Sequence, residues 1–183
     1  IRNRNFGVVL HHPNLIAEQL KNWILEKEKS SYWRQFKEGM LGADAVRTLT
    51  DTVNEILDIK GEISLSERKD LEELWRPPKW LSTMQSYPII GKITSNSFFN
   101  RLAVSYDCAV GFVKAQEDCL KLLESMYRGE GEEERSNLEV IEQEINENII
   151  SGQTFIRNLR NTYPEIYRSI ATRQAIRSVL NYE

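Results

Sequence analysis

The sequence predicts an all-α protein, a multi-helix bundle of six to seven helices with no sheet. Apolar residues recur at helical spacing along almost the whole 183-residue chain. No segment alternates between apolar and polar residues for more than a few positions, as a half-buried strand would. Hydrophobic residues make up 40% of the chain and charged residues 28%, so there is enough apolar material for a folded core.

Two helices are expected first. The first carries apolar residues from Ile16 to Leu41, with Pro13 suited to its first turn and Gly42 to its exit. The polar stretch 27–31 inside it is either a break or a solvated turn. The second helix follows Gly42 and ends before Gly61, because its apolar residues share one helical face.

A third helix and a hinge are expected next. Ser64 and Glu67 have the spacing of a capping box, and Pro77 ends the helix because proline lacks a backbone donor. A short helix around residues 79–85 would be the seventh. Prolines, Gly91 and a cluster of threonine, serine and asparagine then predict a hinge. The predicted organisation is an N-terminal helical half, a hinge and a C-terminal helical half, which together form one domain: residues 1–86, 87–97 and 98–183.

The second half is expected to contain three helices. A long one runs from about Ser97 to Tyr127, and an acidic loop or frayed helix end follows at 129–134. The next carries apolar residues from Leu138 to Leu159. The last begins near Pro164, a residue type that suits a first helical turn.

Residues that usually carry chemistry are scarce. His11 and His12 are adjacent and so cannot share a helical face as a metal pair. No Glu-x-x-His, Cys-x-x-Cys or glycine-rich phosphate-binding motif occurs. Glu142, Glu144 and Glu147 are interpreted as a solvated face. The sequence therefore predicts no catalytic residue, no cofactor and no metal site, and a protein that is not an enzyme.

Composition also indicates the cellular compartment and the kind of partner. Cys108 and Cys119 would lie about 16 Å apart along one helix, too far for a disulfide, which indicates reduced thiols and the cytosol. No run reaches the roughly 20 apolar residues that span a bilayer, and the stretch from Leu102 to Val113 contains Asp107.

The net charge of −3 argues against nucleic acid as a partner. The missing initial methionine indicates an excerpt of a longer chain.

Charge is distributed unevenly near the end of the chain. Residues 130–147 hold eight glutamates against a single arginine, and residues 157–177 hold five arginines against a single glutamate. The blocks are either solvated faces or, for the arginines, a surface that docks a partner domain or anionic lipid headgroups. The candidate contacts are Arg157, Arg160, Arg173 and Arg177. Arg173 and Arg177 are four residues apart and share a helical face.

Tryptophan is the second candidate feature. Trp75 and Trp80 lie on either side of the Pro77–Pro78 stop. They either anchor helix ends in the core or form a contact patch for another domain, because tryptophan is enriched at binding hot spots.

Several strings of residues resemble a known family. They are YWRQFKEGML at 32–41, RLAVSYD at 101–107, YPEIYR at 163–168 and TRQAIRSVLN at 172–181. Together they resemble the cytosolic helical region of sodium/proton exchangers of the sperm-specific type and of the related plant salt-overly-sensitive type. The resemblance covers most of the chain from about Tyr32 onward. The residues from Arg173 to Arg177 are closer to the sperm type.

The resemblance implies a regulatory and coupling role. Such exchangers swap sodium for protons across the plasma membrane, and this region joins their dimeric membrane domain to a cyclic-nucleotide-binding-like domain. It implies a homodimer at the cytoplasmic face of the plasma or flagellar membrane, in sperm if the chain is of the sperm type. In the sperm type a voltage-sensing bundle would be expected near residues 87–100, where no membrane segment occurs. Either the protein follows the plant-like arrangement, or the sequence omits an insert at this point. The alternative is a free-standing all-α adaptor that binds partner helices in a groove.

Overall fold

The computed structural model describes residues 13–58, 64–66, 68–75, 91–126 and 132–180. Within these ranges there are six helices and no strand, which confirms the predicted all-α bundle. None of these helices is both long enough and apolar enough to cross a membrane. The helices are α1 (Pro13–Lys37), α2 (Ala43–Asp58), α3 (Lys69–Trp75), α5 (Gly91–Met126), α6 (Glu132–Thr162) and α7 (Pro164–Leu180).

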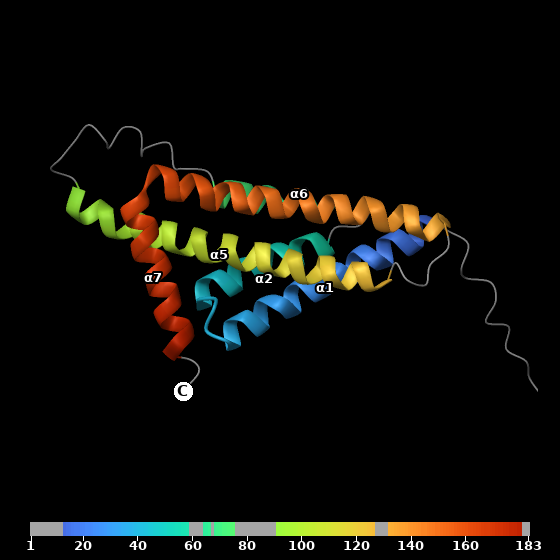
Figure 1. Ribbon diagram of the computed structural model, residues 1–183, viewed down its shortest axis with the longest axis horizontal. Coiled ribbons are helices and arrows are strands. Elements are labelled where there is room, and N and C mark those ends of the chain that lie inside the picture. The colour runs from blue at the N-terminus through green and yellow to red at the C-terminus, as the bar shows by residue number, and fades with distance from the viewer. Residues whose placement is uncertain (1–12, 59–63, 67, 76–90, 127–131, 181–183) are drawn as a thin grey trace, which may run out of the picture.

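Two long helices form the frame of the molecule. Figure 1 shows α5 and α6 side by side and antiparallel, with α1 and α2 packed against α5. Helix α7 turns away from the end of α6 and descends toward the turn between α1 and α2. The last helix of the chain therefore meets the loop that joins the first two.

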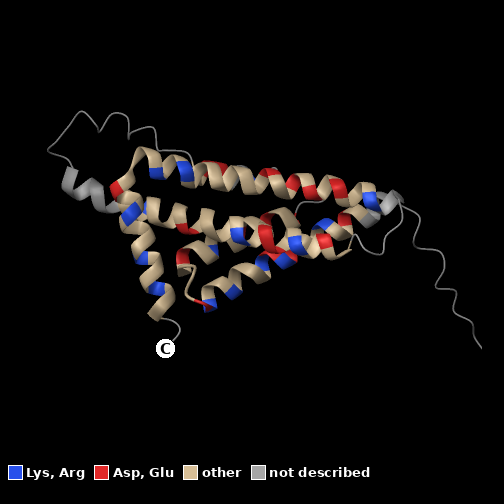
Figure 2. Ribbon diagram, viewed as in Figure 1, with Lys and Arg blue, Asp and Glu red and all other residues tan. Residues whose placement is uncertain are grey.

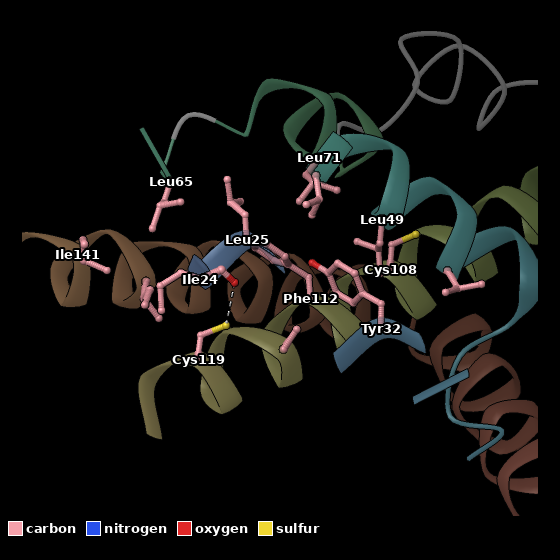
Figure 3. Packing of buried hydrophobic residues seen from close by; sticks show 14 of the residues in the cluster. Ile24, Leu25, Tyr32, Leu49, Leu65, Leu71, Cys108, Phe112, Cys119 and Ile141 are labelled. Carbon is pink, nitrogen blue, oxygen red and sulfur yellow. Dashed lines mark hydrogen bonds between the residues drawn. The ribbon is translucent and has the colours of Figure 1, made fainter. Parts of the chain in front are cut away.

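A single apolar cluster connects the two predicted halves. Helices α1 and α2 contribute residues such as Leu25, Tyr32 and Leu49, and α5 and α6 contribute Phe112 and Ile141 (Figure 3). All five are fully or almost fully buried. A second cluster joins α5, α6 and α7. The shared cluster therefore brings apolar side chains of both predicted halves into one core.

Glycine allows the helices to approach closely at two positions. A Cβ atom on Gly111 would lie 2.5 Å from Cδ2 of Leu41, and one on Gly152 would lie 2.6 Å from Cγ2 of Val113. These gaps are shorter than real carbon–carbon contacts, so only glycine fits without movement. The first contact brings the loop between α1 and α2 against α5, and the second brings α5 against α6.

Several predicted boundaries differ from the structure. Helix α1 is continuous through 27–31, because Glu28 and Ser31 are buried with polar partners instead of being solvated. The proposed capping serine, Ser64, precedes α3 by several residues, and its hydroxyl contacts Ser66 and donates to Glu144.

The predicted hinge is only partly covered by the described residues. Helix α5 begins at Gly91, earlier than the predicted start near Ser97. Its polar cluster therefore lies within the first turns of the helix, where such residues are well tolerated. Residues 87–90 and the predicted short helix at 79–85 lie outside the described residues, so the division into halves stays a prediction.

Candidate functional site

The candidate site lies where α7 meets the loop between α1 and α2. Helix α1 ends at a left-handed glycine, Gly39, whose φ is 70°. Glycine suits this position because it has no side chain to clash. The carbonyl groups after a helix end have no intrahelical partner. Here the Nε of Arg177 donates to the carbonyl of Gly39 at 3.0 Å, and its Nη2 donates to that of Met40 at 2.9 Å.

A buried carboxylate completes the arrangement. Asp107 of α5 accepts a hydrogen bond from the backbone N–H of Gly42 at 3.3 Å and forms an ion pair with Arg177 at 2.8 Å. Gly42 leaves room for the guanidinium, because a Cβ there would lie 3.1 Å from its Nη1. We call the set Gly39, Met40, Gly42, Asp107 and Arg177 the α7–loop junction.

Burial and neighbouring groups have opposing effects on the pKa of Asp107. Burial raises the pKa of this carboxyl above its usual range, because a charged group loses its hydration. The Arg177 guanidinium, the backbone N–H of Gly42 and, last, Arg173 each lower the pKa, and burial outweighs them. Arg177 therefore offsets part of the effect that burial has on the pKa of Asp107.

Side chains of α7 donate several hydrogen bonds to the loop after α1, which fixes the position of α7 relative to that loop. Gln174 lies three residues before Arg177 on the same face, and its side chain also donates to the carbonyl of Met40, at 3.2 Å. A cation near the C-terminal end of a helix is favourable because of the partial negative charge there. A shift of α7 along its axis would break all of these contacts at once.

The other predicted arginines are not part of this junction. Arg173 is on α7, and Arg157 and Arg160 are on α6; all three are exposed. Figure 2 shows acidic residues toward the start of α6 and basic residues toward its end. Opposite charges on one helix are therefore too far apart along it to pair with each other.

The predicted tryptophans are only partly described. Trp75 is half-buried, with its ring centroid 5.7 Å from that of Phe112 and 6.0 Å from that of Phe155. Its ring therefore packs against α5 and α6, and a contact of Trp75 with another domain stays a prediction. Trp80 lies outside the described residues.

A second polar set was missed by sequence reasoning. Glu28 of α1 forms a buried ion pair with Arg68, and Tyr32 donates to the same carboxylate. Burial and then Glu28 raise the pKa of the Tyr32 hydroxyl well above its usual value. The only sequence signal is the spacing of four between Glu28 and Tyr32, which puts both on one face.

Within the described ranges there is no group of histidine, cysteine and acidic side chains that would hold a metal ion. Both cysteines are free and buried. The polar groups at the junction hold helices to a loop, and an arrangement of this kind can transmit a movement from one element to another.

Replacing Arg177 by glutamine should raise the pKa of Asp107 further, because the largest effect that lowers it is removed. A carboxyl whose folded-state pKa is raised contributes stability below its unfolded pKa and loses it as pH rises through the folded pKa. The decrease of folding stability with rising pH should therefore extend to higher pH in Arg177→Gln. Carbon-13 NMR titration of the Asp107 carboxyl checks this.

The matched control for that titration is Arg173→Gln. Arg173 is exposed, and it is the last of the causes that lower the Asp107 pKa. It should shift the titration much less. Equal shifts in the two variants would contradict the direct pairing of Arg177 with Asp107.

Comparison with known proteins gives two weak but extensive matches. The chain is 24% identical over 162 residues to sodium/hydrogen exchanger 8 of Arabidopsis thaliana, which covers 87% of this chain and 20% of that protein. It is 25% identical over 189 aligned positions to sodium/hydrogen exchanger 7 of the same plant, covering 96% of this chain and 16% of the relative. No family model matches the chain. The matches support a relation to sodium/hydrogen exchangers, and the chain spans a fifth or less of these relatives.

Proposed function

We propose that this chain is a cytosolic regulatory and coupling segment of a plasma-membrane sodium/proton antiporter. In this role it links the membrane transport domain to a cyclic-nucleotide-binding-like domain of the same polypeptide. The exchanger would be of the group that includes the sperm-specific and plant salt-overly-sensitive types, at the plasma membrane or, for the sperm type, the flagellar membrane.

The observation that carries the proposal is the α7–loop junction in a chain that aligns with exchangers over most of its length. Arg177 connects the end of the chain to the loop after α1 through backbone carbonyls and a buried carboxylate. A segment placed between two domains must pass movement from its first elements to its last. The junction supplies a direct polar contact between them.

We also propose that two copies associate. The exposed apolar side chains on the outer surface of the described helices include Val140 and Ile150 of α6 and Ile176, Val179 and Leu180 of α7. The three on α7 have the spacing of one helical face, and exposed apolar residues gathered on one face favour association. Analytical ultracentrifugation of the purified chain tests this, and a monomer at high concentration counts against self-association of this segment.

The reading frame around this segment tests the exchanger assignment. We expect a series of long apolar helices before Ile1 and a β-rich domain after Glu183. A frame that begins just upstream and stops just downstream would contradict the assignment and favour the adaptor alternative.

Transport in the exchanger encoded by that frame tests the coupling role. Arg177→Gln should change the regulated rate of sodium-driven proton export at least about fivefold, the lower end of typical coupling between sites. Arg157→Gln, at an exposed position of α6, is the matched control. Equal rates in the two variants, at equal surface abundance, would contradict a coupling role for the junction.

A further inference from the structure

Two adjoining cavities lie between α3, α5 and α6, away from the α7–loop junction. The larger has a volume of about 610 Å³ and the smaller about 230 Å³. Glu72, Trp75 and Ser151 line both of them. The two cavities therefore form neighbouring parts of one site.

The larger cavity has mainly apolar walls. Its aromatic residues include Trp75 and Phe155, which stack with centroids 6.0 Å apart and planes 19° apart, and Phe98 and Tyr163, which meet edge to face. A volume of this size and character is typical of sites that bind the apolar body of a small molecule.

Two residues that line the smaller cavity carry buried donors that have no acceptor. The Nε and Nη1 atoms of Arg68 and the indole Nε1 of Trp75 are buried and have no hydrogen-bond partner among the described residues. Arg68 is 4% exposed, and it uses Nη2 for Glu28 while its guanidinium lies 5.2 Å from the Phe112 ring centroid. Buried donors are nearly always paired, so each unpaired one needs an explanation. A hydrogen-bond acceptor on a bound molecule would pair them.

Charge restricts the kind of acceptor. Glu28 already neutralises Arg68, and Glu72 and Glu147 also line the smaller cavity. These two carboxylates would repel an anion. A cation could pair with these carboxylates, but it would leave the donors of Arg68 and Trp75 without an acceptor. The remaining class is a neutral molecule with a carbonyl acceptor.

We propose that these cavities bind a neutral amphipathic lipid-like molecule whose amide or ester carbonyl accepts from Arg68 and Trp75 while its apolar chain occupies the larger cavity. The site does not depend on the transport role proposed above. It would make the segment responsive to a small apolar ligand.

The test uses three probes with one chain and different head groups: decanamide, decanoate and decylammonium. Calorimetry of the purified chain measures affinity, and NMR of the Trp75 indole N–H reports binding at this site. We expect saturable decanamide binding at least about tenfold tighter than that of either charged probe, the value of roughly one or two hydrogen bonds. The Trp75 indole proton should move in the direction of stronger hydrogen bonding.

Two variants separate the site from general adsorption. Trp75→Phe keeps an aromatic ring but removes the indole donor, and should weaken decanamide binding several-fold. Ser151→Leu places a large side chain at an exposed position where the two cavities adjoin, and should abolish binding while circular dichroism stays unchanged. Gln153→Leu, also exposed on α6 but outside both cavities, is its matched control.

Four results would overturn the proposal. Equal affinity for all three head groups would show adsorption to apolar surface only. Tightest binding of decanoate would show an anion site. The absence of a saturable shift at Trp75 would show that its indole donor does not meet the ligand, and binding that survives Ser151→Leu would show that the ligand binds elsewhere.

Discussion

Replacing Glu28 by alanine should lower the free energy of unfolding by about 3–5 kcal/mol, the typical cost of removing one partner of a buried ion pair. The side chains of Arg68 and Glu28 are only 3% and 2% exposed. The variant leaves the guanidinium buried without its counter-charge. It also leaves the Tyr32 hydroxyl without its acceptor. Urea denaturation followed by circular dichroism measures the loss.

A double variant distinguishes this explanation from simple loss of packing. With Glu28→Met and Arg68→Met together, no charge remains buried, and a well-packed apolar pair often costs little or even stabilises. The double variant should therefore be more stable than Glu28→Ala. Glu26→Ala, at an exposed position of α1, is the control and should change stability by less than about 0.5 kcal/mol. A loss below about 1 kcal/mol for Glu28→Ala would refute the buried-charge explanation.

Phe112→Ala should also cost about 3–5 kcal/mol, the range for removing a buried aromatic side chain. Phe112 is 1% exposed, and its ring contacts Trp75 and the guanidinium of Arg68. Its removal leaves a cavity beside a charged group and breaks the central contact of the main apolar cluster (Figure 3). Thermal unfolding should show the loss as a reduced Tm.

Two further variants calibrate that result. Phe112→Leu keeps most of the apolar volume and should cost clearly less than alanine. Val140→Ala on α6 removes methyl groups from a side chain that is 54% exposed, and should have almost no effect. Equal costs for the leucine and alanine variants would mean that the ring contacts, and not the cavity, determine the loss.

The sequence predicted the helices better than their ends. Helical spacing of apolar residues is a local signal, so all six described helices were expected. The polar stretch 27–31 is ambiguous in the sequence because two of its residues, Glu28 and Ser31, are buried. The partner of Ser31, Asp118, comes from a distant helix. Ser64 was misjudged as a cap because its hydroxyl contacts Glu144 on α6. Tertiary contacts overrode the local pattern in both cases.

The candidate site was predicted less well. Charge patterning selected Arg177 together with three other arginines but could not single it out, because its acceptors are backbone carbonyls about 137 positions earlier in the chain. Asp107 had a usable signal, as a carboxylate inside the most apolar stretch of the sequence. Such a residue must be paired when buried. The identity of its partner required the three-dimensional fold.

The two buried thiols can report how often the helices of the bundle separate. Cys108 lies against the carbonyl of Ala45 in α2, and Cys119 against that of Ile24 in α1, at 3.9 and 3.7 Å. Burial raises the pKa of both thiols, so separation of α5 from its neighbour should favour the reactive thiolate. The rate at which a thiol reagent labels Cys108 then reports separation of α5 from α2. The labelling rate of Cys119 reports separation of α5 from α1. Unequal rates would reveal which of the first two helices leaves the bundle first.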